Sequence, residues 1–128
     1  MTYISLTDRI NAIAAKIDTG WVKTIDVGEG WYQIVVDMYD ELSVLDPDHK
    51  ILQIKQKFGG IRYYFRTDKD EATRIKMNVV VSKYEKIALE TCEATGKRGI
   101  LMQKGFIYKT LNPESAPDGW TPVGRMRT

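Results

Sequence analysis

Two runs of alternating apolar and polar residues, separated by Gly59 and Gly60, form the clearest pattern in the chain. Both runs are rich in Ile, Phe and Tyr, and a Gly-Gly dipeptide accommodates the positive φ angles of a two-residue hairpin turn. The pattern predicts an antiparallel β-hairpin from Ile51 to Thr67, with both glycines in its turn.

This turn sets the predicted register, in which Phe58 faces Ile61 and Lys57 faces Arg62. Because side chains alternate with period 2, each face of the hairpin has its own chemistry. The predicted core face consists of Leu52, Ile54, Gln56, Phe58, Ile61, Tyr63 and Phe65. The predicted outward face is basic with one aromatic ring, and consists of Lys55, Lys57, Arg62, Tyr64 and Arg66.

Apolar residues at helical spacing predict three helices. The first begins with a cap at Ser5 and ends before Gly20, and the second runs from Trp31 to Leu45. The third follows the capping segment from Asp68 to Asp70 and ends before Gly96. The acidic side of the second helix, which holds Asp37, Asp40 and Glu41, is expected to face solvent.

The remaining segments are rich in turn residues. Trp21 to Gly30 is expected to be a loop with at most a short strand, in which the glycines give a flexible helix entry. Arg98 to Leu111 predicts a second hairpin with Gly105 in its turn. Beyond it, prolines and glycines make residues 112–128 an irregular tail that Trp120 can pin to the body.

The order helix, helix, hairpin, helix, hairpin predicts an α+β fold in which the helices cover one face of a small antiparallel sheet. A chain of 128 residues, 43% of them hydrophobic, is long enough for one core. The expected organisation is a single domain over residues 1–111 followed by the tail. The other face of the sheet stays open, and the basic face of the hairpin then looks outward.

Charge and composition narrow the function classes. A net charge of +2 is too small for general polyanion binding, so any attraction for phosphate depends on local clustering. One cysteine, Cys92, and one histidine, His49, exclude a disulfide framework and a Cys/His zinc site within one chain, and no cofactor is expected. Without a membrane-length apolar run or a signal peptide, a cytoplasmic protein is expected.

Three stretches resemble a family of small uncharacterised proteins of bacteriophages and prophages. They are Gly30-Trp31-Tyr32, Leu45-Asp46-Pro47-Asp48, and the run Gln53 to Tyr64 with its Lys-Phe-Gly-Gly-Ile-Arg-Tyr core. The family often continues with Cys-Glu-x-Cys-Gly and a second Cys pair, like a zinc ribbon. Here Cys92-Glu93-Ala94-Thr95-Gly96 keeps only the first thiol, which implies that the metal site is lost. The resemblance implies a phage accessory protein that acts against host defences in the host cytoplasm.

Like charges facing each other across two strands cost up to about 1 kcal/mol unless an anion relieves them. The relief can come from acidic groups of this chain or a second copy. It can also come from a nucleotide-type ligand, with phosphate on Lys55, Lys57, Arg62 and Arg66 and a base stacked on Tyr64 or Trp31. A second hypothesis is an inhibitor that docks on a host defence complex, as an anti-CRISPR protein does, and a degenerate zinc ribbon associated with nucleic acid is a third. Catalysis by a Cys92–His49 pair is not expected, because the sequence shows no third group to orient it.

Overall fold

Local capping chemistry explains where the helices begin. In the computed structural model, which describes residues 4–124, helix α1 (Leu6–Ala15) starts where the Ser5 side chain accepts from the Asp8 N–H at 3.0 Å. Helix α3 (Glu71–Ala88) starts in the same way, because Asp70 accepts from the Thr73 N–H. Helix α2 (Tyr32–Leu45) follows a single 3-10 turn, η1 (Glu29–Trp31), and Asp46, the residue before Pro47, is its C-cap.

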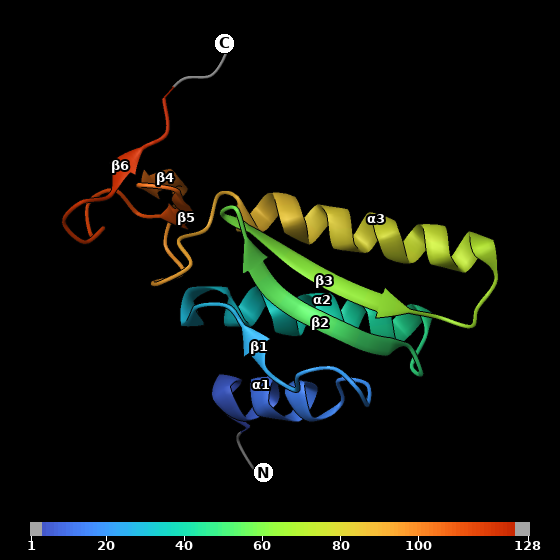
Figure 1. The fold of residues 1–128 in the computed structure, drawn as a ribbon. Coiled ribbons are helices and arrows are strands. Elements are labelled where there is room, and N and C mark those ends of the chain that lie inside the picture. Colours follow the sequence, from blue (N-terminus) through green and yellow to red (C-terminus); the bar gives the residue numbers. More distant parts are fainter. Residues whose placement is uncertain (1–3, 125–128) are drawn as a thin grey trace.

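The predicted α+β fold is confirmed, with the helices behind a small sheet (Figure 1). Strands β2 (Lys50–Lys57) and β3 (Gly60–Arg66) form the antiparallel hairpin, and the short strand β1 (Ile25–Asp26) runs parallel to β2. The sheet order is β1-β2-β3, so the sheet is mixed rather than purely antiparallel. Figure 1 shows the hairpin crossing in front of α2, with α3 running along the β3 side.

The predicted register of the hairpin is wrong, because its turn lies one residue earlier. Phe58 and Gly59 occupy the turn with φ of 53° and 85°, and Gly60 already belongs to β3. Lys57 therefore pairs with Gly60, and Phe58 is 68% exposed instead of buried. Each residue from Gln53 to Lys57 faces a partner two positions earlier in the chain than predicted. Because side chains alternate with period 2, a shift of two leaves them on the predicted faces, and Ile61 stays in the core.

Contacts distant in sequence explain this register. The Thr110 hydroxyl donates to the Gly59 carbonyl at 2.7 Å, and a Cβ added at Gly59 would lie 2.4 Å from the Leu101 side chain. The tip of the hairpin is therefore fixed by the C-terminal part of the chain, which turn propensity cannot report. A register irregularity between Ile51 and Gln53 additionally turns Ile51 into the core in place of Leu52.

One apolar cluster fills the space between the sheet and the helices. Trp31 is completely buried in it, and its predicted place on the inner face of the second helix is correct. The other fully buried members with large side chains are Ile13, Ile17, Val35, Met38, Leu42, Ile51, Ile54, Ile61 and Met77. This layer leaves the opposite face of the hairpin uncovered by helices (Figure 1).

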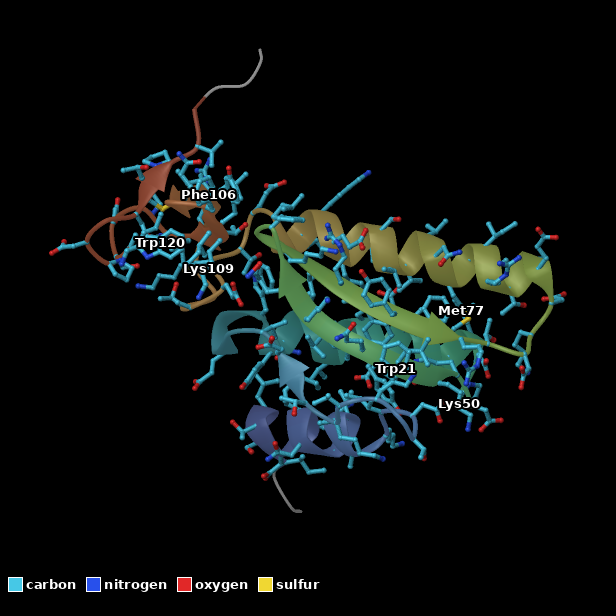
Figure 2. All side chains as sticks on the ribbon, viewed as in Figure 1. Trp21, Lys50, Met77, Phe106, Lys109 and Trp120 are labelled. Atoms are coloured by element: carbon cyan, nitrogen blue, oxygen red, sulfur yellow. The ribbon has the colours of Figure 1, made fainter. Side chains whose placement is uncertain are left out.

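The C-terminal segment forms a second small sheet beyond the tip of the hairpin. Strands β4 (Ile100–Lys104) and β5 (Ile107–Leu111) make the predicted second hairpin, and β6 (Thr121–Pro122) pairs with β4. The segment expected to be an irregular tail thus contributes a strand, while its residues 125–128 lie outside the described range. Trp120 packs on a separate apolar cluster of Cys92, Met102 and Leu111, as expected for a residue that pins this segment (Figure 2).

Candidate anion-binding face

The outward side of the hairpin brings together five of the six residues predicted to bind a ligand. Residues paired across neighbouring strands share a face of the sheet. Lys55 pairs with Arg62, and Gln53 pairs with Tyr64. We use the name basic face for Lys55, Lys57, Arg62, Tyr64 and Arg66.

The like-charge pair exists, but it joins Lys55 to Arg62 rather than Lys57 to Arg62. Within residues 4–124, Lys55, Lys57 and Arg62 make no ion pair with a carboxylate. Arg62 donates instead to the carbonyl of Ile61 at 3.2 Å. These three charges are thus unneutralised by direct contact, which leaves them free to bind an anion.

Two acidic residues border this cluster, and they differ in effect. Asp18 accepts from Arg66 at 2.9 Å, so Arg66 is already paired. Asp26 stands beside Lys55 in the parallel register of β1 and β2, on the same face, but forms no ion pair with it. The basic face is therefore partly neutralised at two edges and positive at its centre.

Tyr64 gives this face an accessible aromatic surface, because its side chain is 41% exposed. It lines a shallow cavity of about 450 Å³ beside the outer strand β3, together with Arg66, Arg74 and Asn78. Arg74 adds a further cation there, since its contact with Glu71 is loose at 3.7 Å. A planar ring stacked on Tyr64 would have guanidinium groups within this same cavity.

Trp31, the sixth predicted residue, is not part of the site. Its ring is fully buried, and its indole N–H donates to the Thr91 carbonyl at 2.8 Å. The residue type suggested stacking, but its place in the stripe of the second helix indicated burial. Trp31 therefore connects η1 to the segment after α3 and is unable to stack on a ligand.

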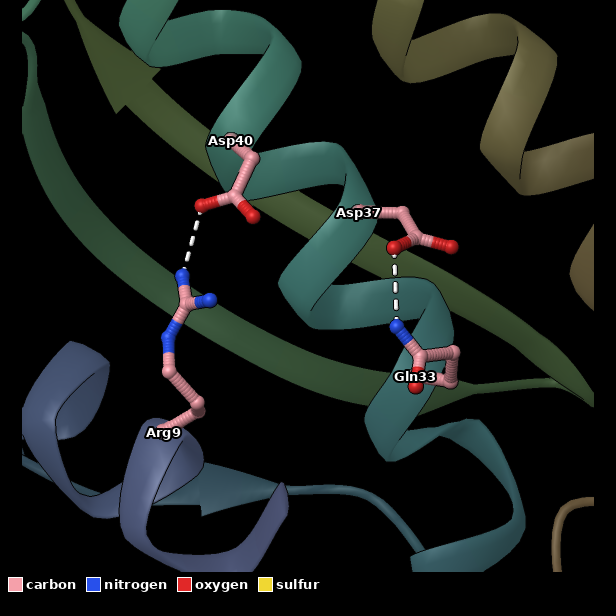
Figure 3. Close-up of polar contacts among 4 residues, drawn as sticks. All are labelled: Arg9, Gln33, Asp37 and Asp40. Atoms are coloured by element: carbon pink, nitrogen blue, oxygen red, sulfur yellow. Dashed lines mark hydrogen bonds and ion pairs between the residues drawn. The ribbon is translucent and has the colours of Figure 1, made fainter. Parts of the chain in front are cut away.

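Two of the three acidic residues of α2 form ion pairs with cations of the neighbouring helices. Asp40 accepts from Arg9 of α1 at 2.6 Å, and Asp37 accepts from Gln33 one turn earlier (Figure 3). Glu41 accepts from Lys83 of α3 at 2.6 Å. The contacts of Asp40 and Glu41 join α2 to α1 and α3, so these two carboxylates have a structural role.

The two candidate catalytic groups lie in different apolar clusters. His49 is held by Asp46 and Tyr63, with its Nδ1 2.9 Å from the Asp46 carbonyl and its Nε2 2.8 Å from the Tyr63 hydroxyl. Burial lowers the pKa of His49. Cys92 belongs to the C-terminal cluster.

The thiol of Cys92 accepts hydrogen bonds from neighbouring residues. Burial would raise its pKa, but hydrogen bonds from the Thr95 side chain and from the backbone of Asn112, Thr95 and Ala94 outweigh burial and lower the pKa. The described part of the chain holds no group of three or more His, Cys, Asp or Glu side chains arranged for a metal ion.

Sequence reasoning missed three charged residues near the hairpin. The outward orientation of Asp26 was predictable from the sequence, because Asp26 alternates with the apolar residues Ile25 and Val27. The positions of Glu93 and Lys109 were not predictable from the sequence, because only tertiary packing brings these residues to the end of β1.

Comparisons with known proteins identify no relative. No protein-family model, curated protein or solved structure matches the chain. Among the helices of residues 4–124, none has the length and apolar character needed to cross a membrane.

Proposed function

We propose that this protein binds a small anionic ligand of nucleotide type through the basic face, and that it acts by sequestering this ligand rather than by catalysis. The observation that supports the proposal is the opposed pair Lys55 and Arg62, which no carboxylate of residues 4–124 neutralises by contact. A phosphate bound between two cations forms charge-assisted hydrogen bonds and removes their repulsion.

Tyr64 supports a ligand that carries a ring as well as a phosphate. Aromatic side chains hold bases by stacking, worth about 1–3 kcal/mol per base. The resemblance to phage accessory proteins supplies the biological setting of the proposal, a counter-defence protein that removes a nucleotide signal in the host cytoplasm.

Equilibrium dialysis of the purified chain against adenosine triphosphate, guanosine triphosphate and a cyclic dinucleotide tests this function. At least one probe should bind, and Lys55→Ala should weaken it by roughly 1.5–3 kcal/mol, the value of a hydrogen bond to a charged group. Lys86→Ala removes the same charge from the exposed side of α3 and should leave the affinity unchanged. Equal affinities for the wild type and Lys55→Ala would contradict the proposal.

An inhibitor of a host protein complex is the second candidate, and exposed apolar residues of α3 favour it. Ile75 and Val79 lie one helical turn apart with 55% and 64% of their surfaces exposed, and Ile87 continues the same side. Exposed apolar surface of this kind is typical of protein interfaces. If this candidate holds, Val79→Glu abolishes protection of an infecting phage, whereas Lys55→Ala leaves protection intact.

A further inference from the structure

The cavity beside Tyr64 lies between the outer strand of the sheet and the first half of α3. Its volume of about 450 Å³ falls within the range of small-molecule sites, about 300–1,000 Å³. Strand β3 contributes Tyr64 and Arg66 to its lining, and α3 contributes Arg74 and Asn78. We name this space the Tyr64 cavity.

The two guanidinium groups of this cavity differ in what they contact. Arg66 donates to Asp18 at 2.9 Å. The closest carboxylate oxygen to Arg74 belongs to Glu71 and lies 3.7 Å away, beyond the range of a hydrogen bond. More than half of the Arg74 side chain is exposed. Arg74 therefore keeps its donors available for a ligand in the cavity.

The shape of a guanidinium group selects the base that it binds. Its planar fork donates two parallel hydrogen bonds, and its commonest specific contact with a base is to O6 and N7 of guanine. Adenine carries an amino group where guanine carries O6, so the fork would meet a donor instead of an acceptor. Asn78 does not discriminate, because its amide offers both a donor and an acceptor. A base read by Arg74 is therefore guanine rather than adenine.

A base stacked on Tyr64 has one open direction, across the outer edge of β3. This strand is the last in the sheet order β1-β2-β3, and Figure 1 shows α3 running along its outer side. Arg74 and Asn78 line the cavity there and lie one helical turn apart. A base that extends over the edge of β3 therefore brings its far side to these two residues.

The position of Tyr64 in β3 connects this base to the cations that bind phosphate. Arg62 and Tyr64 are two residues apart on the same face, which places them about 7 Å apart along the strand. Lys55 pairs with Arg62 from the neighbouring strand. The ribose of a nucleotide can bridge this distance, so one ligand can occupy both the Tyr64 cavity and the centre of the basic face.

We propose that the Tyr64 cavity binds guanine, which stacks on Tyr64 and accepts hydrogen bonds from Arg74 at O6 and N7. The proposal rests on the nucleotide-type ligand proposed above and names the base of that ligand. It assigns to Arg74, a residue of α3 outside the hairpin, the choice between the two purines.

Nucleotides that differ in one or two groups of the base test this assignment. In titration calorimetry of the full chain, guanosine triphosphate should bind at least tenfold more tightly than adenosine triphosphate. The deaza analogue of guanosine triphosphate, with carbon in place of N7, should bind at least threefold more weakly than guanosine triphosphate itself. Arg74→Ala should remove both differences. The matched control Lys76→Ala removes the same charge from an exposed position of α3 outside the cavity lining and should keep both ratios.

The outcomes separate this assignment from the proposed function. Equal affinities for the two purine triphosphates, or a guanine preference that persists in Arg74→Ala, would overturn the assignment. If Lys55→Ala still weakened both nucleotides in such a case, the basic face would remain the binding site and only the choice of base would be wrong. Binding of no nucleotide would overturn both proposals. If Arg74→Ala fails to fold, the deaza analogue decides on the wild type, and an affinity equal to that of guanosine triphosphate overturns the assignment.

Discussion

At the scale of single residues, close backbone contacts determine which side chains are tolerated. Gly30 lies against the turn that begins at Cys92, and its N–H donates to the Glu93 carbonyl. The sequence suggested that this glycine gives a flexible entry to the second helix. The structure instead gives it a packing role, because there is no space for a side chain at this position.

Gly30→Ala should lower the free energy of unfolding by about 1–3 kcal/mol, as overpacking of a filled site does. The added Cβ would lie within 2.6 Å of three backbone atoms, which must move apart. Gly124→Ala is the control, since no atom of residues 4–124 lies within 4 Å of its added Cβ. Urea unfolding measures both variants, and equal stabilities would contradict the role assigned to Gly30.

His49 should make stability depend on pH. Its native pKa is lowered by burial, so below the unfolded value of about 6.5 the unfolded chain binds a proton that the native chain does not. The free energy of unfolding should therefore fall as the pH drops from about 7 to 5. His49→Gln should reduce this dependence, measured by urea unfolding at several pH values. An unchanged slope in the variant would show that other groups cause it.

At the scale of elements, the hairpin turn combines an unfavourable backbone conformation with favourable tertiary contacts. Phe58 holds a φ of 53°, a left-handed conformation that bulky residues rarely adopt. The same turn places Gly59 against Leu101 and Thr110. The strain at Phe58 is therefore offset by the contacts of its neighbour.

Phe58→Asn should stabilise the protein by up to about 1–2 kcal/mol, because Asn tolerates the left-handed region and Asn-Gly is a favoured two-residue turn. The exposed ring of Phe58 has little burial to lose. Thermal unfolding measures the change. A lower melting temperature would indicate that the Phe58 ring makes a contribution in the native state that its exposure does not suggest.

The elements differ in how far their sequences predict them. Helix starts at Ser5 and Asp70 were predictable, because a cap and the residue it bonds lie within one turn. The faces of the hairpin were also predictable, since alternation needs only the strands themselves. The register was not, because Gly59 and Gly60 both permit a turn and the choice depends on Leu101 and Thr110.

At the scale of the whole molecule, two hydrogen bonds join the C-terminal part of the chain to the segments before it. Trp31 donates to Thr91, and Thr110 donates to Gly59. Neither link could be inferred from sequence, since each joins residues more than 50 positions apart. For the same reason, the places of Glu93 and Lys109 at the end of β1 were not predicted, whereas the basic face, which lies within one hairpin, was.

Thr110→Val keeps the shape of a fully buried side chain but leaves the Gly59 carbonyl without its donor. The free energy of unfolding should fall by about 1–3 kcal/mol, the cost of an unsatisfied buried group. Thr121→Val, at an exposed site in β6, should change stability by less than about 0.5 kcal/mol. Similar small effects of both substitutions would argue against a tight connection between the two sheets.

The salt dependence of nucleotide affinity tests the central claim, that the positive centre of the basic face binds phosphate. The dissociation constant of a nucleoside triphosphate should rise steadily with added sodium chloride in the wild type. Arg62→Ala should weaken binding by roughly 1.5–3 kcal/mol and flatten this dependence, whereas Tyr64→Ala should weaken binding and leave the slope unchanged. An affinity that does not respond to salt, or that survives Arg62→Ala in full, would contradict the claim.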